Sequence, residues 1–202
     1  KILMTIPLEI IDLSKTYDTK EAVRNISFKV NENEIIGILG PNGCGKTTTI
    51  GMILGLLKPT KGKVLINGIE IEKQRVELLN ELNFISPYIE LPKKLTVKQN
   101  LEVYGRLYDV KELGIKIDYL CEKLRLNEFI NKITGELSSG QKNRVSLAKS
   151  IINDPSVLLL DEPTASLDPE TGDFVRSFLE EYQKEKKTSI LLASHNMSEV
   201  ER

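Results

Sequence analysis

The amino-acid sequence predicts an α/β fold built on a mostly parallel central sheet. Three short apolar runs have the length of strands buried on both faces: Ile35–Leu39, Val157–Leu160 and Thr188–Ala193. Between them, Lys46–Leu57 and Thr171–Lys186 carry apolar side chains at helical spacing. The composition, 40% hydrophobic and 28% charged over 202 residues, is that of a globular domain. Strands that alternate with helices favour a parallel sheet.

Composition and charge exclude several classes of protein. With 28 basic and 29 acidic residues the formal net charge is −1, which argues against strong electrostatic affinity for nucleic acid or anionic lipid. No apolar run approaches the roughly 18–20 residues that span a bilayer. The two cysteines, Cys44 and Cys121, form no disulfide framework and no metal pattern. We therefore expect a cytoplasmic protein without a nucleic-acid partner.

The N-terminal third is predicted to combine short strands with one glycine-rich loop. Alternation and β-branched residues predict strands at Leu8–Leu13, Ile26–Val30 and Val64–Ile66. The polar segment Ser14–Arg24 is expected to be a turn-rich connection. Gly40–Gly45 holds three glycines and a proline and must be a loop, and Asn67-Gly68 is a hairpin signal.

The composition becomes helical from about Gln74 to Ser150. Apolar side chains at helical spacing predict three helices: Gln99–Leu107, Ile117–Leu124 and Gln141–Ile152. Two prolines make Ser86–Leu95 an irregular connector. We expect one domain over residues 1–202, with a helical subdomain inserted at about 88–150.

A phosphate-binding loop is the most specific motif. The run Gly40-Pro41-Asn42-Gly43-Cys44-Gly45-Lys46-Thr47-Thr48 matches G-x-x-x-x-G-K-[ST] and has a predicted strand before it and a helix after it. Glycines let backbone N–H groups turn around phosphates, and the helix N-terminus faces the same anions. Lys46 can reach the β- and γ-phosphates, and the Thr47 hydroxyl can ligate Mg²⁺.

An acidic pair follows the buried run Val157–Leu160. Asp161, at the carboxyl end of a strand beside the phosphate loop, can hold Mg²⁺. The adjacent Glu162 can orient and deprotonate a water molecule. Acidic residues are also common at ordinary strand ends. The pair therefore indicates a functional site only in combination with the phosphate loop.

One further segment identifies a family. Leu137-Ser138-Ser139-Gly140-Gln141 resembles the LSGGQ signature of ATP-binding cassette (ABC) ATPases, with Ser139 in place of the first glycine. It precedes the acidic pair, as it does in that family. A Ser-Ser-Gly turn that caps the following helix would explain these residues equally well. It is the ordered set of motifs, over nearly the whole chain, that resembles the nucleotide-binding domain of an ABC transporter.

The resemblance implies a fold and a set of roles. The fold would be that of a P-loop NTPase, with an N-terminal antiparallel β subdomain and an inserted helical subdomain. Lys46, Glu162 and His195 would be catalytic, and Thr47 and Asp161 would hold Mg²⁺. Nucleotide would contact the phosphate loop, with Tyr17 stacked on adenine. Two copies would close head to tail on ATP, so that residues of one copy complete the site of the other: Ser138, Ser139, Gly140, Gln141 and Asp168.

The same resemblance implies a partner in the membrane. The chain would be the ATP-hydrolysing subunit of a transporter, peripheral on the cytoplasmic face and coupled to separate transmembrane permease subunits. Two alternatives stay open, a non-transport ABC ATPase and a regulatory nucleotide-binding module. The absence of sustained heptads between Lys46 and Ser138 counts against the chromosome-maintenance type. The segment 101–108 faintly resembles drug or polysaccharide export systems. We also expect the family domain to continue beyond residue 202.

One position departs from the family pattern. A glutamine usually follows the strand near residues 82–86, and Pro87 occupies that position here. Proline lacks the side-chain oxygen that glutamine presents to the metal and the water. The departure puts in doubt the usual contact through which the nucleotide site is coupled to the membrane subunits. Ser86, Tyr88 and Glu90 are possible substitutes for the missing glutamine. It does not affect the prediction of nucleotide binding.

Overall fold

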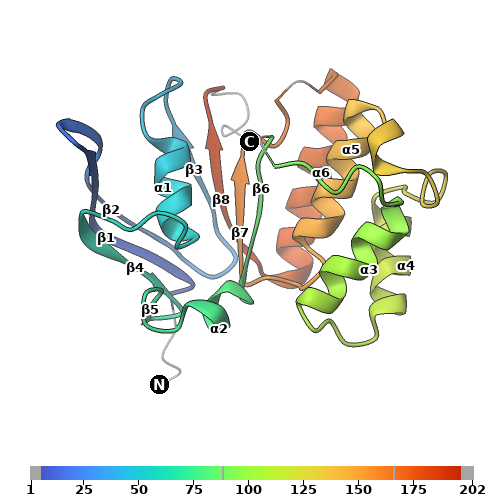
Figure 1. Ribbon diagram of the computed structural model, residues 1–202, viewed down its shortest axis with the longest axis horizontal. Helices are drawn as coiled ribbons and strands as arrows, with labels where there is room; N and C mark the ends of the chain where they lie inside the picture. The colour runs from blue at the N-terminus through green and yellow to red at the C-terminus, as the bar shows by residue number, and fades with distance from the viewer. Residues whose placement is uncertain (1–5, 88, 166, 197–202) are drawn as a thin grey trace.

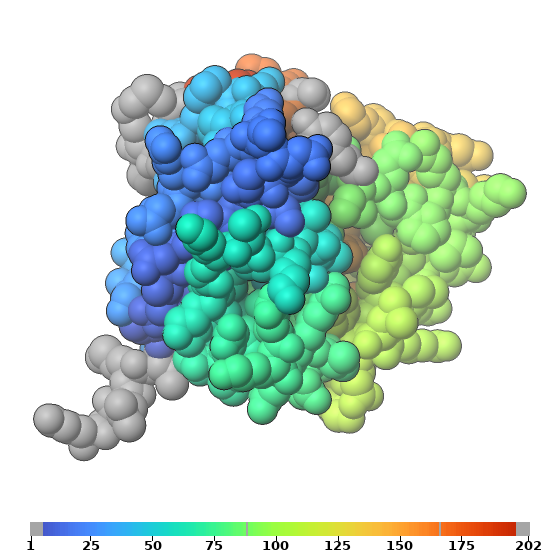
Figure 2. Space-filling model, turned by 60° about the vertical axis from the view of Figure 1, so that its left-hand side comes forward, coloured from blue at the N-terminus to red at the C-terminus, as the bar shows by residue number. Residues whose placement is uncertain are grey.

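The computed structural model describes residues 6–87, 89–165 and 167–196, which form two sheets and their covering helices (Figure 1). The first sheet is antiparallel, in the order β2-β1-β4-β5. Its strands are β1 (Leu8–Tyr17), β2 (Lys20–Val30), β4 (Lys61–Ile66) and β5 (Ile69–Glu70). It is the antiparallel β unit that the family resemblance implied. Figure 2 shows this sheet, in blue and teal, as one face of the molecule beside the light-green region that holds α3 (Val97–Leu107) and α4 (Leu113–Lys123).

The prediction of a turn-rich connection at Ser14–Arg24 was wrong. β1 and β2 continue through this polar segment and turn only between Tyr17 and Lys20, which pair with each other. Register shifts interrupt the β1–β2 ladder, and the Ser14 hydroxyl accepts a hydrogen bond from the Asn25 backbone N–H at 2.8 Å. Cross-strand pairing thus overrides the polar composition.

The second sheet is parallel, in the order β3-β8-β7-β6, and confirms the predicted α/β class. Its strands are β3 (Ile35–Leu39), β8 (Ser189–Ser194), β7 (Val157–Asp161) and β6 (Leu82–Ile85). Every residue of β7 and β8 is buried, as their unbroken apolar runs predicted. All four carboxyl ends meet at the upper edge in Figure 1.

Two apolar cores lie on opposite faces of this parallel sheet. Successive side chains of a strand point to opposite faces. Val157 and Leu159 accordingly join the core shared with α1 (Lys46–Ile53), α2 (Arg75–Leu79) and the antiparallel sheet. Leu158 and Leu160 join the core on the other face, which the helices within residues 97–186 share. Packing on both faces therefore holds the parallel sheet, and with it the carboxyl edge of the sheet, in place.

Helix α1 (Lys46–Ile53) is shorter than the predicted Lys46–Leu57. Gly55 has a φ of +63°, in the left-handed region, and the N–H groups of Leu56 and Leu57 donate back to the Gly51 carbonyl at 2.9 and 3.0 Å. This is the usual way in which a glycine ends a helix. The spacing of apolar residues continues beyond this point, so it predicted a helix that was too long.

The remaining helices are α2 (Arg75–Leu79), α3 (Val97–Leu107), α4 (Leu113–Lys123), α5 (Ser139–Ser150) and α6 (Pro169–Lys186), with a 3₁₀ turn at Thr134–Glu136. They confirm the four predicted helices α3 to α6 to within a few residues at most ends. β6 lies inside the stretch whose composition is helical. Composition alone therefore concealed this four-residue strand, which the family resemblance placed near residues 82–86. None of the helices in the described ranges is long and apolar enough to cross a membrane.

The described residues of the segment 86–95, all but residue 88, form the irregular connector that the prolines predicted. Buried Asn100 of α3 ties this connector to its surroundings. Its amide nitrogen donates to the carbonyl of Pro92 at 3.2 Å and to the Thr134 hydroxyl at 2.8 Å. The connector is therefore held in place near the end that leads into α3.

Candidate nucleotide site

The phosphate loop joins β3 to α1 at the carboxyl edge of the parallel sheet. Gly45 has a φ of +102°, and a Cβ there would collide with the Ala22 carbonyl oxygen. Only glycine fits this position. The rest of the loop is open to solvent, with four residues exposed: Pro41, Asn42, Gly43 and Cys44. With Thr47 exposed and Thr48 half-buried, the first turn of α1 can present backbone N–H groups to phosphate.

Lys46 is folded beneath this loop and is only 7% exposed. Its ammonium donates to the carbonyl oxygens of Gly40 at 2.6 Å and Pro41 at 3.3 Å. It also lies 3.8 Å from Glu162 Oε1. The loop carbonyls and the carboxylate thus hold the cation at the base of the loop.

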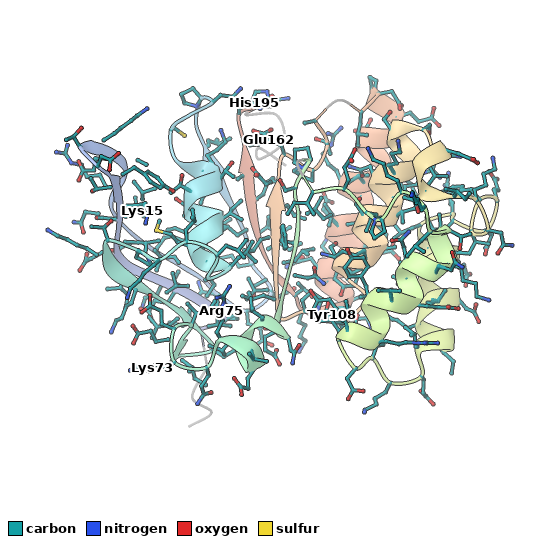
Figure 3. All side chains as sticks on the ribbon, in the orientation of Figure 1. Lys15, Lys73, Arg75, Tyr108, Glu162 and His195 are labelled. Carbon is teal, nitrogen blue, oxygen red and sulfur yellow. The ribbon has the colours of Figure 1, made fainter. Side chains whose placement is uncertain are left out.

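Glu162 lies where β7 ends and its backbone turns sharply. Its φ is +51°, an unfavourable region for a non-glycine residue, while its N–H still donates to the Ala193 carbonyl of β8 at 2.9 Å. Its Oε2 lies 2.8 Å from His195 Nδ1 and 3.4 Å from the Ser194 hydroxyl. Figure 3 labels Glu162 and His195 at this edge. The strand ends therefore bring Lys46, Glu162 and His195 together, as the sequence predicted for one site.

Asp161 is 2% exposed, and two hydroxyl groups converge on one of its oxygens. Asp161 Oδ2 accepts from Thr47 Oγ1 at 3.3 Å and from Ser86 Oγ at 3.4 Å. Burial raises the pKa of this carboxyl, and the hydrogen bond from Thr47 acts in the opposite direction. Carboxylate and hydroxyl oxygens are ligands that Mg²⁺ accepts when phosphate supplies the others. Thr47 and Asp161 therefore fit the predicted metal site.

Tyr17 ends β1 and is 44% exposed. The Lys15 ammonium lies 5.1 Å from the ring centroid and donates to the Lys58 carbonyl at 2.7 Å. The β1–β2 hairpin that carries Tyr17 lies beside the phosphate loop, because the Ala22 carbonyl of β2 contacts Gly45. An exposed aromatic ring beside a phosphate loop can stack on a base.

The signature residues lie at the N-terminus of α5. Ser138 and Gln141 form a reciprocal capping box, with Gln141 N–H donating to the Ser138 hydroxyl at 3.3 Å and Ser138 N–H donating to the Gln141 side chain at 3.1 Å. The capping alternative is thus realised in the structure. Ser139 is exposed and Gly140 half-buried, so the positive end of α5 also faces outward.

Asp168 caps α6 and is exposed. Its carboxylate accepts hydrogen bonds from the Thr171 N–H at 2.9 Å and the Thr171 hydroxyl at 2.7 Å, and these bonds lower its pKa. Pro169 occupies the first helical position. Ser166, two residues before Asp168, lies outside the described residues.

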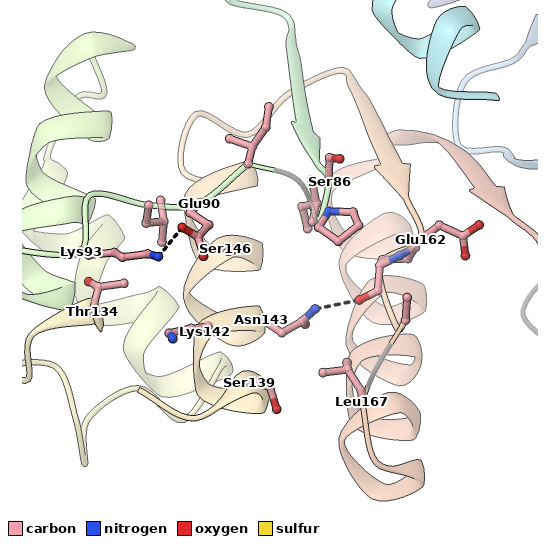
Figure 4. A pocket seen from close by; sticks show the side chains of 16 residues that line it. Ser86, Glu90, Lys93, Thr134, Ser139, Lys142, Asn143, Ser146, Glu162 and Leu167 are labelled. Carbon is pink, nitrogen blue, oxygen red and sulfur yellow. Dashed lines mark hydrogen bonds and ion pairs between the residues drawn. The ribbon is translucent and has the colours of Figure 1, made fainter. Parts of the chain in front are cut away.

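A cavity of about 300 Å³ lies between the connector, α5 and the turn after β7 (Figure 4). Asn143 of α5 crosses it, and its amide donates to the Pro163 carbonyl at 2.7 Å. This bond links the signature helix to the residue after Glu162. Sequence reasoning missed Asn143, since no motif marks it. Ser194 was also missed, although a serine before His195 at a strand end was a usable signal.

Comparisons with known proteins agree with this geometry. The sequence profile of the family described as ABC transporter matches residues 23–165. NatA, an ABC transporter ATP-binding protein of Bacillus subtilis, is 34% identical over 96% of this chain, which spans 81% of NatA. Nod factor export ATP-binding protein I of Rhizobium johnstonii is 38% identical over 99% of this chain, which spans 65% of that protein.

A solved structure gives the same result for the fold. The dimeric ATP-binding cassette MJ0796, in a post-hydrolysis state with ADP and Pi, superposes with a TM-score of 0.84 and 26% identity over 95% of this chain and 89% of the other. Along the chain, the phosphate loop, the signature and the acidic pair follow one another in the order expected for the family. The chain therefore belongs to the ABC transporter family, as an ATP-binding and ATP-hydrolysing domain.

Proposed function

We propose that the chain is the ATPase subunit of an ABC transporter and that it works as a head-to-tail pair beneath separate transmembrane permease subunits. The observation that carries this is the convergence of Lys46, Glu162 and His195 beside the Thr47–Asp161 pair at one sheet edge. The names of NatA and of the Nod factor export protein support a transport role. The permease contact would place the chain on the cytoplasmic face of the membrane.

Each residue has a defined part in ATP hydrolysis. Lys46 exchanges the loop carbonyls for the β- and γ-phosphates, and the exposed N–H groups of the loop hold the same oxygens. Thr47 and Asp161 would hold Mg²⁺, which would offset the negative charge of the phosphates. Glu162, oriented by His195 and Ser194, accepts a proton from the attacking water. His195, which lies beside Glu162, would contact the γ-phosphate.

The second copy would complete the site through the exposed end of α5. Ser139 and Gly140 are accessible, and the positive end of α5 suits an anion supplied from outside the chain. Asp168 and the start of α6 lie close by, since a Cβ on Gly140 would contact Thr171 at 3.4 Å. We infer that these residues meet the γ-phosphate of the partner copy.

Dimerisation on ATP tests this arrangement. In a chain whose hydrolysis is blocked by Glu162→Gln, we expect a monomer-to-dimer shift on adding ATP, measured by sedimentation velocity. Adding Ser139→Glu should abolish the dimer while ATP affinity stays within about twofold, because a carboxylate would oppose the partner's phosphate but not its own site. The control is Ser177→Glu, on the exposed side of α6. A dimer that survives Ser139→Glu would reject the trans contact.

Pro87 gives a second test. Because Lys46, Thr47, Asp161, Glu162 and His195 are all in place, Pro87→Gln should change the basal ATPase rate of the isolated chain by well under tenfold, or 1.4 kcal/mol of barrier. Its effect on ATPase stimulated by the reconstituted membrane partner should be larger. The measurement is ATPase rate with and without that partner. A large rise in the isolated chain would show instead that Pro87 impairs catalysis, as in a regulatory module.

A further inference from the structure

Ser86 occupies a special place at the nucleotide-site edge of the sheet. It directly follows β6, which pairs in parallel register with β7 so that Ile85 lies opposite Leu160. The next residues along, Ser86 and Asp161, are therefore neighbours. The Ser86 hydroxyl lies 3.4 Å from Asp161 Oδ2, the same oxygen that Thr47 Oγ1 approaches at 3.3 Å.

These distances describe a cluster in which two hydroxyl oxygens lie beside the same carboxylate oxygen. Two oxygens that share an octahedral Mg²⁺ at about 2.1 Å lie roughly 3 Å apart. The two hydroxyl oxygens stand only slightly farther than that from Asp161 Oδ2. The carboxylate is almost fully buried, so a cation beside it would meet little competition from water. The cluster is also hard-oxygen throughout, which suits Mg²⁺ and not a softer metal.

Among the connector residues that the structure describes, the alternatives to Ser86 do not lie in this cluster. Pro87 has no side-chain donor or acceptor. Glu90 is turned to Lys93, with which it forms an ion pair at 2.6 Å across the cavity from Glu162 (Figure 4). Tyr88 lies outside the described residues. Of the connector residues that the structure describes, Ser86 is the one shown in contact with Asp161.

We propose that the Ser86 hydroxyl is a third protein oxygen of the Mg²⁺ site, with Thr47 and Asp161, and links that site to the connector 86–95. This inference rests on the proposed function, since the metal enters with the nucleotide. Because Asn100 ties the connector to α3, a displacement of the helices would reach the metal through Ser86. The serine thus provides the link from metal to connector that Pro87 cannot.

Metal affinity tests the inference without measuring catalysis. Mn²⁺ replaces Mg²⁺ and is observed by electron paramagnetic resonance, in the presence of a non-hydrolysable ATP analogue. We expect Ser86→Ala to weaken Mn²⁺ binding by about tenfold. Ser86→Thr, which keeps the hydroxyl, should stay within about twofold of the parent chain. Binding of the analogue in EDTA should be the same in all three.

Two results would overturn the inference. One is unchanged Mn²⁺ affinity in Ser86→Ala, and the other is equal weakening in Ser86→Ala and Ser86→Thr, which would mean a steric role. Circular dichroism confirms that each variant is folded. If the parent chain itself bound neither the analogue nor Mn²⁺ with it, the proposed function would fail instead, so the two failures are distinguishable.

A change of metal preference separates ligation from hydrogen bonding to Asp161. In Ser86→Cys, a thiolate in place of the hydroxyl should raise the affinity for Cd²⁺ relative to Mn²⁺ by about tenfold or more, since soft metals prefer sulfur. The parent chain, which already contains Cys44 and Cys121, is the matched control. An unchanged Cd²⁺ to Mn²⁺ ratio would show that residue 86 does not touch the metal.

Discussion

Glu162→Gln is expected to lower the ATPase turnover rate by about 10²- to 10⁴-fold, the usual cost of losing a positioned general base. The substitution keeps the size of the side chain at the end of β7 but removes its charge. Glu162 is the carboxylate that His195 Nδ1 contacts at 2.8 Å and that faces Lys46 at 3.8 Å. Single-turnover hydrolysis with saturating ATP and Mg²⁺ measures the chemical step directly.

The same variant should still bind ATP, because Lys46 and the phosphate loop are intact. It should then accumulate as an ATP-bound dimer. Glu77→Gln, an exposed carboxylate on α2, is the matched control and should hydrolyse ATP at the parent rate. Turnover at the parent rate in Glu162→Gln would assign the base to another group.

Lys46→Ala should weaken Mg²⁺-dependent ATP binding by about 10- to 100-fold. A hydrogen bond to a charged group contributes about 1.5–3 kcal/mol, and each 1.4 kcal/mol is tenfold in affinity. Lys46 is also the single side-chain cation that the phosphate loop contains. Titration calorimetry with a non-hydrolysable analogue measures the loss.

The control for this variant is Lys63→Ala, an exposed lysine on β4. It changes the net charge by the same amount and should bind ATP as the parent chain does. Removal of Lys46 also leaves Glu162 without its buried cation, so circular dichroism must show that the fold is kept. Equal affinity in Lys46→Ala and the parent would refute the assignment of residues 40–48 as a phosphate loop.

Local patterns predicted most of the elements and the chemistry at their ends. A glycine-rich loop between an apolar run and a helix can be read from neighbouring residues alone, because backbone freedom and side-chain spacing are local properties. The acidic pair could be predicted for the same reason, because it directly follows a buried apolar run. Errors arose where distant partners overrode local composition. The polar segment Ser14–Arg24 became paired strand, and β6 formed inside a helical stretch because β7 lay beside it.

The residue types of the site follow from the sequence: the loop lysine, the acidic pair and the histidine after the last strand. Which of their atoms meet depends on how the strands and helices pack. Lys46, Glu162 and His195 come from three separate segments, and the order β3-β8-β7-β6 places their strand ends side by side. The contacts of Ser86 with Asp161 and of Asn143 with the Pro163 carbonyl follow from the same packing. Strand order and register depend on hydrogen bonds between distant residues and on the burial of both sheet faces, which no local pattern encodes.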